Sequence, residues 1–279
     1  MRTQTSGGED MTEAPKLDDV AVCMQNGEPE KALEALKDRI RHDSGNAELR
    51  LSLAQLECIN GNWDKALSAA DTASTLDSDR ALLCQQWKLQ IQAEITRGEV
   101  FAGKKTAIVM GEPEAWMAGM QDALRMDAEG QSEAADKARR HAMEQAPARS
   151  GTINGAAFEW LCDADERVGP AFEAVINGRY TWIPQSVVNS IHVKSPVEMI
   201  DLVWAEAVIR LKNGGETTAF MPARYPGSDS NEDGKIRLGR LTTFETTPGG
   251  TSTGLGQRLF ATNADDYPLM QCNDIEFDD

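Results

Sequence analysis

Apolar residues recur at helical spacing through the first half of the chain. A pattern that repeats every three or four residues predicts amphipathic helices with one buried face. Two such stripes, which we interpret as core, consist of Leu49, Leu53 and Leu56 and then of Leu82, Trp87 and Leu89. A further helix is predicted over 115–126, where we interpret a stripe of Trp and Met as packing and not as a ligand site.

The pattern changes beyond about residue 156 to Val, Ile, Thr and aromatic residues punctuated by Gly and Pro, which is typical of strands. Two short runs, Ala171–Ile176 and Arg179–Ile183, flank Asn177-Gly178. Because Asn-Gly readily adopts the positive φ angles of a type I′ turn, we predict a β-hairpin here. A second hairpin is predicted from Ala207–Leu211 and Thr217–Met221.

The remaining β-prone runs are short and their connections are rich in turn residues. Strands are expected within Val187–Val193, Ile236–Phe244, Gln257–Ala261 and Leu269–Phe277, and a short helix or turn over Pro196–Trp204. Many short strands in little more than a hundred residues predict a small twisted barrel or a curled sheet.

An internal repeat organises the helical half. Asn26–Leu33 aligns with Asn60–Leu67, 34 residues further on, with Gly in the second position and Lys-Ala-Leu at the end of both. This period, with Gly in the turn between paired helices, matches the tetratricopeptide pattern of stacked helical hairpins. A degraded third copy is expected from Gly130 through Ala138.

These patterns predict an α+β protein, with N-terminal tetratricopeptide-like helical hairpins followed by a C-terminal small β-rich, barrel-like domain. Residues 1–16 are polar and without periodicity, and we expect a disordered tail there. Pro, Gly and Ser between 147 and 156 mark a boundary, so the domains are predicted as 17–150 and 151–279.

Composition narrows the classes of partner. The 279 residues carry a formal net charge of −17, and acidic groups outnumber basic ones in both halves, which argues against nucleic acid and anionic membrane surfaces as partners. Neither a membrane-spanning run nor a secretory signal peptide is evident, so a cytoplasmic protein is expected. The five cysteines lack metal-site spacing and are expected to be reduced core thiols.

Candidate chemistry centres on Asp163, Asp165 and Glu166, the densest acidic cluster. Grouped carboxylates can act as acid and base, but here they precede a hairpin and Arg167 is adjacent, so we favour turn capping and ion pairing over catalysis. No metal or cofactor is expected. The 229–234 segment matches only the first half of a calcium loop, and we interpret it as a solvated loop. The Gly254–Gly256 segment is interpreted as a site of close backbone approach.

The motifs of the second half, taken together, resemble the ImpE/TagJ family of type VI secretion accessory proteins. They are Phe158-x-Trp160, Asp163-x-Asp165-x-Arg167-x-Gly169-Pro170, Asn177-Gly178-x-Tyr180-x-Trp182-x-Pro184, Asp201-x-x-Trp204, Met221 through Ser228 with Arg224 and Tyr225, Leu238-Gly239-Arg240-x-Thr242, and Gly254-Leu255-Gly256-Gln257-Arg258. Their order and spacing extend over about 120 residues. The helical repeats agree with the family's layout.

The resemblance implies a non-enzymatic adaptor that binds the N-terminal helix of the small sheath subunit, TssB, and modulates sheath assembly or recycling by ClpV. Two alternatives stay open: a general tetratricopeptide scaffold for another protein, and a hydrolase-type enzyme that uses the acidic cluster. Candidate family-motif or partner-binding residues are Trp160, Asp163, Asp165, Arg167, Tyr180, Trp182, Trp204, Arg224 and Tyr225. We expect the aromatic residues among them to be core.

Overall fold

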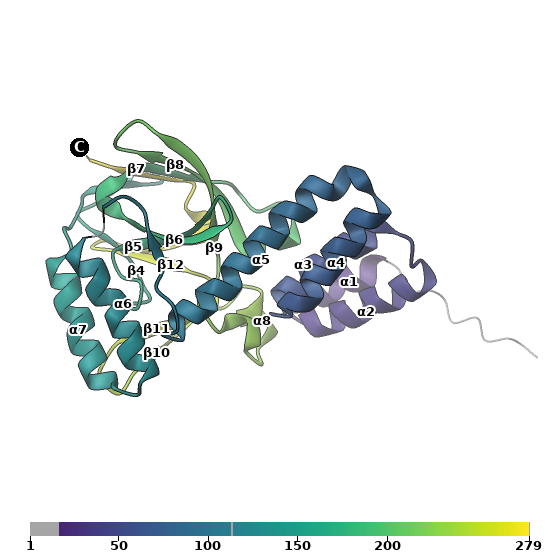
Figure 1. Ribbon diagram of the computed structural model, residues 1–279, viewed down its shortest axis with the longest axis horizontal. Coiled ribbons are helices and arrows are strands. Elements are labelled where there is room, and N and C mark those ends of the chain that lie inside the picture. Colours follow the sequence, from purple (N-terminus) through teal and green to yellow (C-terminus); the bar gives the residue numbers. More distant parts are fainter. Residues whose placement is uncertain (1–16, 113, 279) are drawn as a thin grey trace, which may run out of the picture.

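The computed structural model describes residues 17–112 and 114–278, and the predicted tail lies outside them. Five helices come first and pack as antiparallel neighbours (Figure 1). They are α1 (Leu17–Gln25), α2 (Pro29–His42), α3 (Ala47–Ile59), α4 (Trp63–Leu76) and α5 (Ala81–Phe101). The repeat is confirmed: Gly27 and Gly61 occupy corresponding turns with φ of 79° and 68°, angles that glycine adopts without strain.

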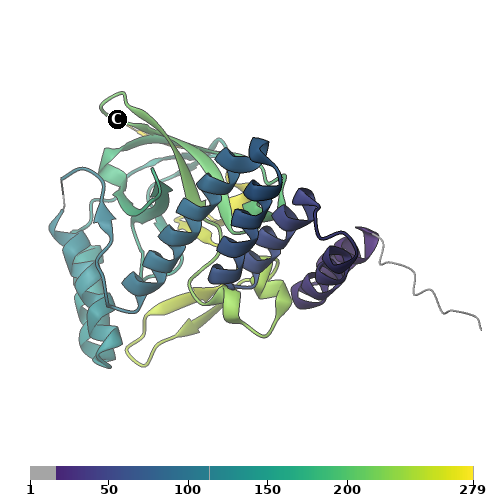
Figure 2. The same cartoon turned by 45° about the vertical axis from the view of Figure 1, so that its right-hand side comes forward.

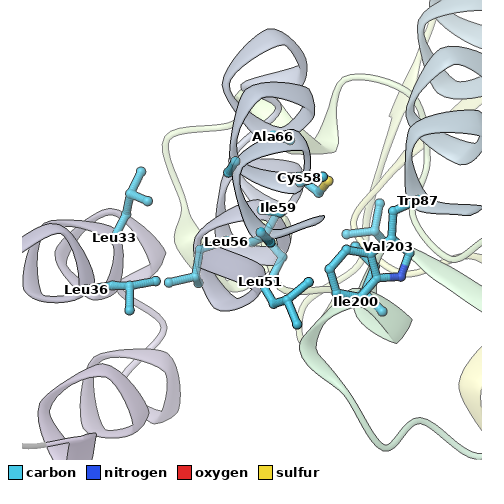
Figure 3. Close-up of a cluster of buried hydrophobic side chains, with 14 of the residues drawn as sticks. Leu33, Leu36, Leu51, Leu56, Cys58, Ile59, Ala66, Trp87, Ile200 and Val203 are labelled. Carbon is cyan, nitrogen blue, oxygen red and sulfur yellow. The ribbon is translucent and has the colours of Figure 1, made fainter. Parts of the chain in front are cut away.

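The core of this helical array continues into the β-rich half of the chain. Leu36 and Leu56 are buried between the repeats, and the same cluster reaches Ile200 and Val203, which lie on the chain leading into the sheet (Figure 3). Since one apolar cluster joins the two halves, burial of apolar surface holds them together. The division at residue 150 stays a prediction about independent folding.

One predicted core stripe is wrong in part. Trp87 is 5% exposed as expected, but Leu82 is 87% exposed and Leu89 is 37% exposed. Helix α5 is 21 residues long and runs diagonally from the repeats across the sheet, so its neighbours cover different faces along its length (Figure 2). Periodicity identifies an apolar face but does not say whether another element covers it.

A third helical hairpin follows, made of α6 (Ala115–Ala128) and α7 (Ser132–Gln145). Gly130 forms its turn with φ of 76°, and Ala135 is buried, as the degraded repeat predicts. The hairpin lies beyond α5, apart from the first two hairpins (Figure 1). The Trp and Met stripe of α6 is core, as expected, because Met117 and Met120 pack in one cluster with Trp182.

The main sheet has nine strands in the order β1-β6-β5-β9-β8-β7-β14-β2-β3, and only the β1–β6 pair is parallel. Because β1 and β3 stand at opposite ends of this order, the described sheet is open and curled instead of a closed barrel. The bounds are β1 (Ile108–Val109), β2 (Gly151–Ile153), β3 (Ala156–Phe158), β5 (Ala171–Ile176), β6 (Arg179–Pro184), β7 (Val188–Val193), β8 (Trp204–Leu211), β9 (Glu216–Pro222) and β14 (Asp274–Phe277).

Both predicted hairpins are confirmed. Strands β5 and β6 meet at Asn177 and Gly178, whose φ angles of 50° and 73° fit the type I′ turn. Strands β8 and β9 pair from Trp204 with Pro222 to Arg210 with Glu216. The predicted turn before β8 is a 3₁₀ segment, Met199–Leu202.

Smaller sheets complete the β-rich half. They contain β4 (Leu161–Asp163), β12 (Leu259–Thr262) and β13 (Asp266–Pro268) in one and β10 (Thr243–Thr246) and β11 (Ser252–Leu255) in the other. The strand predicted over Ile236–Phe244 is wrong at its start, because Asp233 caps the short helix α8 (Gly234–Arg237) by accepting from the Lys235 N–H. The strand expected within Leu269–Phe277 begins only at Asp274, after a 3₁₀ turn.

Candidate functional site

A buried network of charges lies where α5 meets the sheet. Its centre is Glu173 on β5, which accepts hydrogen bonds from Arg97 of α5, from Arg258 and from the Tyr180 hydroxyl. The Arg97 Nε to Glu173 Oε1 distance is 2.7 Å. Arg97 also pairs with Glu94 one turn earlier in α5, so this helix and the sheet are joined by hydrogen-bonded charges.

The first two carboxylates of the sequence-predicted acidic cluster belong to the same network. Asp163 pairs with Arg258, and its Oδ1 accepts from the Asp165 N–H at 2.8 Å. Asp165 receives the Arg167 side chain and the Gly254 N–H. Both aspartates are buried, and their oxygens accept hydrogen bonds from protein donors. These oxygens are therefore not open to a substrate.

Two of these carboxyl groups have pKa values shifted in opposite directions. Burial raises the pKa of Asp163 to about 7, since the single guanidinium of Arg258 does not offset desolvation and the neighbouring carboxylate of Asp165. Burial would also raise the pKa of Glu173, but the guanidinium groups of Arg97 and Arg258 outweigh it and hold the pKa at about 2. Of these two groups, Glu173 is the one that its arginine partners hold ionised well below neutral pH.

Aromatic candidates from the second predicted strand are part of this interior. The Trp182 indole N–H donates to the Tyr180 hydroxyl at 2.6 Å, and that hydroxyl donates onward to Glu173. Tyr180 is 2% and Trp182 0% exposed. Burial, with the Glu173 charge beside it, raises the pKa of Tyr180 well above its usual value, so this tyrosine stays a neutral donor.

Arg224 connects the sheet to the first helical repeats. It is buried, and its guanidinium donates to the carbonyls of Ile59 at 2.8 Å and Cys58 at 3.3 Å, in the last turn of α3. Carbonyls at a helix C-terminus lack helical partners and carry partial negative charge, so this contact caps the helix. Arg240, which is exposed, donates in the same way to Met24 and Gln25 at the end of α1.

The other candidate aromatics differ in exposure. Trp204 is buried, and its indole N–H donates to Glu94 of α5 at 3.1 Å. Tyr225 is buried and packs so tightly on Gly254 that a Cβ there would lie 2.3 Å from the ring. Trp160 is 38% exposed, so the prediction that it belongs to the core is wrong. Of the nine candidates, Trp160 and the half-buried Arg167 are the two with side-chain surface exposed to solvent.

The contacts of the acidic cluster bear on the enzyme alternative, which was motivated by the possibility that its carboxylates are free to act as acid and base. Glu166 Oε2 accepts from the Ser252 N–H at 2.7 Å, and the two aspartates are paired as described. Within residues 17–112 and 114–278, no group of three or more His, Cys, Asp and Glu side chains is placed to hold a metal ion. The three carboxylates of the predicted cluster are thus engaged in contacts that connect parts of the β-rich half.

The 229–234 segment packs against the repeats. Asp229 lies against the turn of the second repeat, where a Cβ on Gly61 would come within 2.4 Å of its carboxylate. Gly234 lies against the first repeat, where its own Cβ would meet the Gly27 carbonyl oxygen at 2.1 Å. The segment thus docks on both repeats. The prediction of a solvated loop is wrong at Asp229 and Gly234, which contact the repeat turns.

The interpretation of Gly254–Gly256 as a site of close backbone approach is confirmed, since a Cβ on Gly256 would meet the Leu241 oxygen at 1.9 Å.

Sequence reasoning missed Arg97 and Glu173, which hold the centre of the network. Glu173 sits inside an apolar strand run and Arg97 inside a helix, so neither stands in a recognisable motif. A signal does exist in the strand sequence, because Glu173 is the one charged residue in the apolar run Ala171–Ile176 and a charge buried with such a run requires a partner.

An open trough lies between α5, α3 and the face of β8 and β9. It consists of two cavities of about 300 and 460 Å³ that share the side chains of Gln86, Gln90, Glu206 and Phe220. We call this surface the α5 trough. Helices and sheet together form its concave wall.

The architecture defines a class of α+β proteins in which helical repeats are fastened to a curled sheet by buried arginines. The crystal structure of protein VPA1032 from Vibrio parahaemolyticus has this fold, with a TM-score of 0.86 over 93% of this chain and 97% of that one at 21% identity. The family model described as ImpE protein matches residues 155–276. The chain is also 39% identical over 257 residues to the type VI secretion system accessory component TagJ of Pseudomonas aeruginosa, covering 91% of this chain and 89% of that protein.

The chain therefore belongs to the ImpE family, as its motifs predicted. Among the described residues, none of the helices combines the length and the apolar character that a bilayer crossing requires.

Proposed function

We propose that this protein is an accessory component of a type VI secretion system that acts in the cytoplasm as a non-enzymatic adaptor. In this proposal it binds the N-terminal helix of the small sheath subunit, TssB, and so modulates assembly of the sheath or its recycling by ClpV. The observation that carries the proposal is the 39% identity to TagJ over nearly the whole of both chains, which includes the helical repeats as well as the β-rich half.

The physical character of the molecule supports an adaptor. Helical-hairpin arrays offer grooves for an amphipathic helix, and the α5 trough is such a concavity. A net charge of −17 favours a basic partner segment over nucleic acid. The candidate carboxylates are occupied by arginines and backbone amides, which is what a structural junction needs.

The test is a binding measurement with the purified sheath subunit, once intact and once without its first helix. We expect the intact subunit to bind and the shortened one to lose binding at least tenfold. Equal binding by both would contradict helix capture. If neither binds, a general scaffold for another protein becomes the better description.

A further inference from the structure

The walls of the α5 trough determine what kind of segment can enter it. One wall is the face of β8 and β9, which are interior strands: β8 pairs with β7 and β9, and β9 pairs with β8 and β5. Their backbone groups are used within the sheet, so an added strand has no edge to join there. The opposite wall is α5, whose backbone is also satisfied. An occupant therefore makes contact through side chains, which is how a helix binds a groove.

The trough carries apolar side chains that the fold leaves wholly or partly exposed. Leu82 is 87% and Leu89 is 37% exposed, two turns apart on α5, and both line the wider cavity. Phe220 of β9 lines both cavities. The narrower cavity has Trp87 in its wall, a residue that joins the core seen in Figure 3. Apolar side chains spaced along one helix and facing a concavity suit the apolar stripe of a second helix.

Charge around the trough is strongly one-sided. Carboxylates line the narrower cavity from both the helices and the sheet, and they belong to Glu48, Glu198, Asp201 and Glu206. Arg80 is the cation among the lining residues of the two cavities, and it pairs with Glu48 and Asp77. Glu206 pairs with Lys194, which lines neither cavity, so four carboxylates face two cations and the surface stays acidic. A partner with Lys or Arg beside its apolar stripe complements this surface.

Gln90 gives an independent indication of a ligand. It is 3% exposed and lines both cavities, yet its Oε1 accepts no hydrogen bond from any described residue. A buried acceptor without a donor is unfavourable, so a donor supplied by a partner would be favoured at this point. A Lys, Arg or hydroxyl side chain at the middle of the bound segment meets that need.

We propose that the α5 trough is the binding site for an amphipathic helix of a protein partner. The apolar stripe of that helix lies on Leu82, Leu89 and Phe220, its basic residues face Glu48 and Glu206, and a donor near its centre reaches Gln90. This inference rests on the proposed adaptor function and adds the location and the chemistry of the contact.

The test uses the full chain and a labelled peptide with the sequence of the sheath subunit's first helix. Leu82→Glu is the main variant, and we expect it to fold normally because the Leu82 side chain is exposed. Val22→Glu, at another exposed apolar residue on α1, is the matched control. We expect at least about a tenfold rise in Kd for L82E and less than about a twofold change for V22E.

A second pair tests the charges. Glu48→Gln with Glu206→Gln should weaken binding and flatten its salt dependence, whereas Glu133→Gln with Glu144→Gln on the exposed face of α7 should leave both unchanged. If the wild type binds the peptide and the trough variants bind it equally well, or if V22E weakens it as much as L82E, the location is overturned while the adaptor function stands. If the wild type fails to bind, the adaptor function itself fails. Self-association that L82E abolishes would identify a second copy as the occupant and overturn the inference.

Discussion

Arg224 and Arg240 cap equivalent helices of two successive repeats. Arg224 donates to the carbonyls of Cys58 and Ile59, and Arg240 donates to those of Met24 and Gln25. The two carbonyl pairs are 34 residues apart, which is the repeat period itself. The segment from 224 to 240 thus contacts the same point of both repeats.

The two caps should differ in strength. Arg224→Ala removes the guanidinium that donates to the buried carbonyls of Ile59 and Arg237, so the free energy of unfolding should fall by roughly 2–4 kcal/mol. Arg240 is exposed, and R240A should lower it by less than about 1 kcal/mol. Urea unfolding followed by circular dichroism measures both. Equal losses would show that burial does not set the strength of these caps.

The repeat turns should tolerate a Cβ unequally. Gly61→Ala places a side chain at φ 68° and against Asp229, so we expect a loss of at least about 1–2 kcal/mol from the left-handed backbone alone. Gly45 has no heavy atom within 4 Å of the position that a Cβ would take and no positive φ, so Gly45→Ala should be neutral or slightly stabilising. Thermal unfolding of the two variants side by side tests this, and a comparable loss for both would contradict the expected difference between the two glycine positions.

Acid should weaken the protein through Glu173. Its pKa is about 2 in the folded state against 4.5 for an unperturbed glutamate, so its contribution is complete above pH 4.5 and is lost as pH falls toward 2. Tyr180→Phe removes a hydrogen bond to this carboxylate, which should raise its folded-state pKa and move the loss of stability to higher pH. Unfolding midpoints across the acidic range, from below the folded-state pKa to above the unfolded one, give the comparison.

The matched control for that experiment is Tyr267→Phe, at a half-buried tyrosine on β13 away from the network. It should reproduce the wild-type pH profile. An unchanged profile for Y180F as well would mean that the hydroxyl does not stabilise the Glu173 charge.

Alanine substitution of Trp182 and of Trp160 should reduce stability by different amounts. Trp182 is fully buried, so Trp182→Ala should lower the free energy of unfolding by about 3–5 kcal/mol. Trp160 is 38% exposed, and W160A should lose about 1 kcal/mol or less. Urea titrations distinguish them, and a large loss for W160A would require a packing role that its exposure does not suggest.

Sequence patterns predicted those parts of the fold that local residues determine. The 34-residue repeat, the Asn177-Gly178 turn and the α6 stripe each have a signature in the sequence itself, and all three are confirmed. Leu82 and Leu89 show the limit, because their exposure depends on which distant strand lies beside α5.

The candidate site was predicted only in outline for the same reason. The family motif located Asp163, Asp165 and Arg167, and the arginine adjacent to the cluster indicated the ion pair that Arg167 forms with Asp165. Arg97 and Glu173 are 76 residues apart, so their ion pair follows from the crossing of α5 over the sheet and from no local pattern. Likewise, the 229–234 segment contacts the turns of both repeats, which lie about 170 residues or more before it in the sequence, so its local resemblance to a calcium loop could not predict this role.

The contact of one segment with both repeats has a mechanical consequence. Helical repeats that contact only their neighbours can bend and twist relative to one another. Here the segment that carries Arg224 and Arg240 contacts equivalent positions of two repeats, so it restrains how these repeats are oriented relative to one another. A surface already set in shape loses little conformational entropy when it binds.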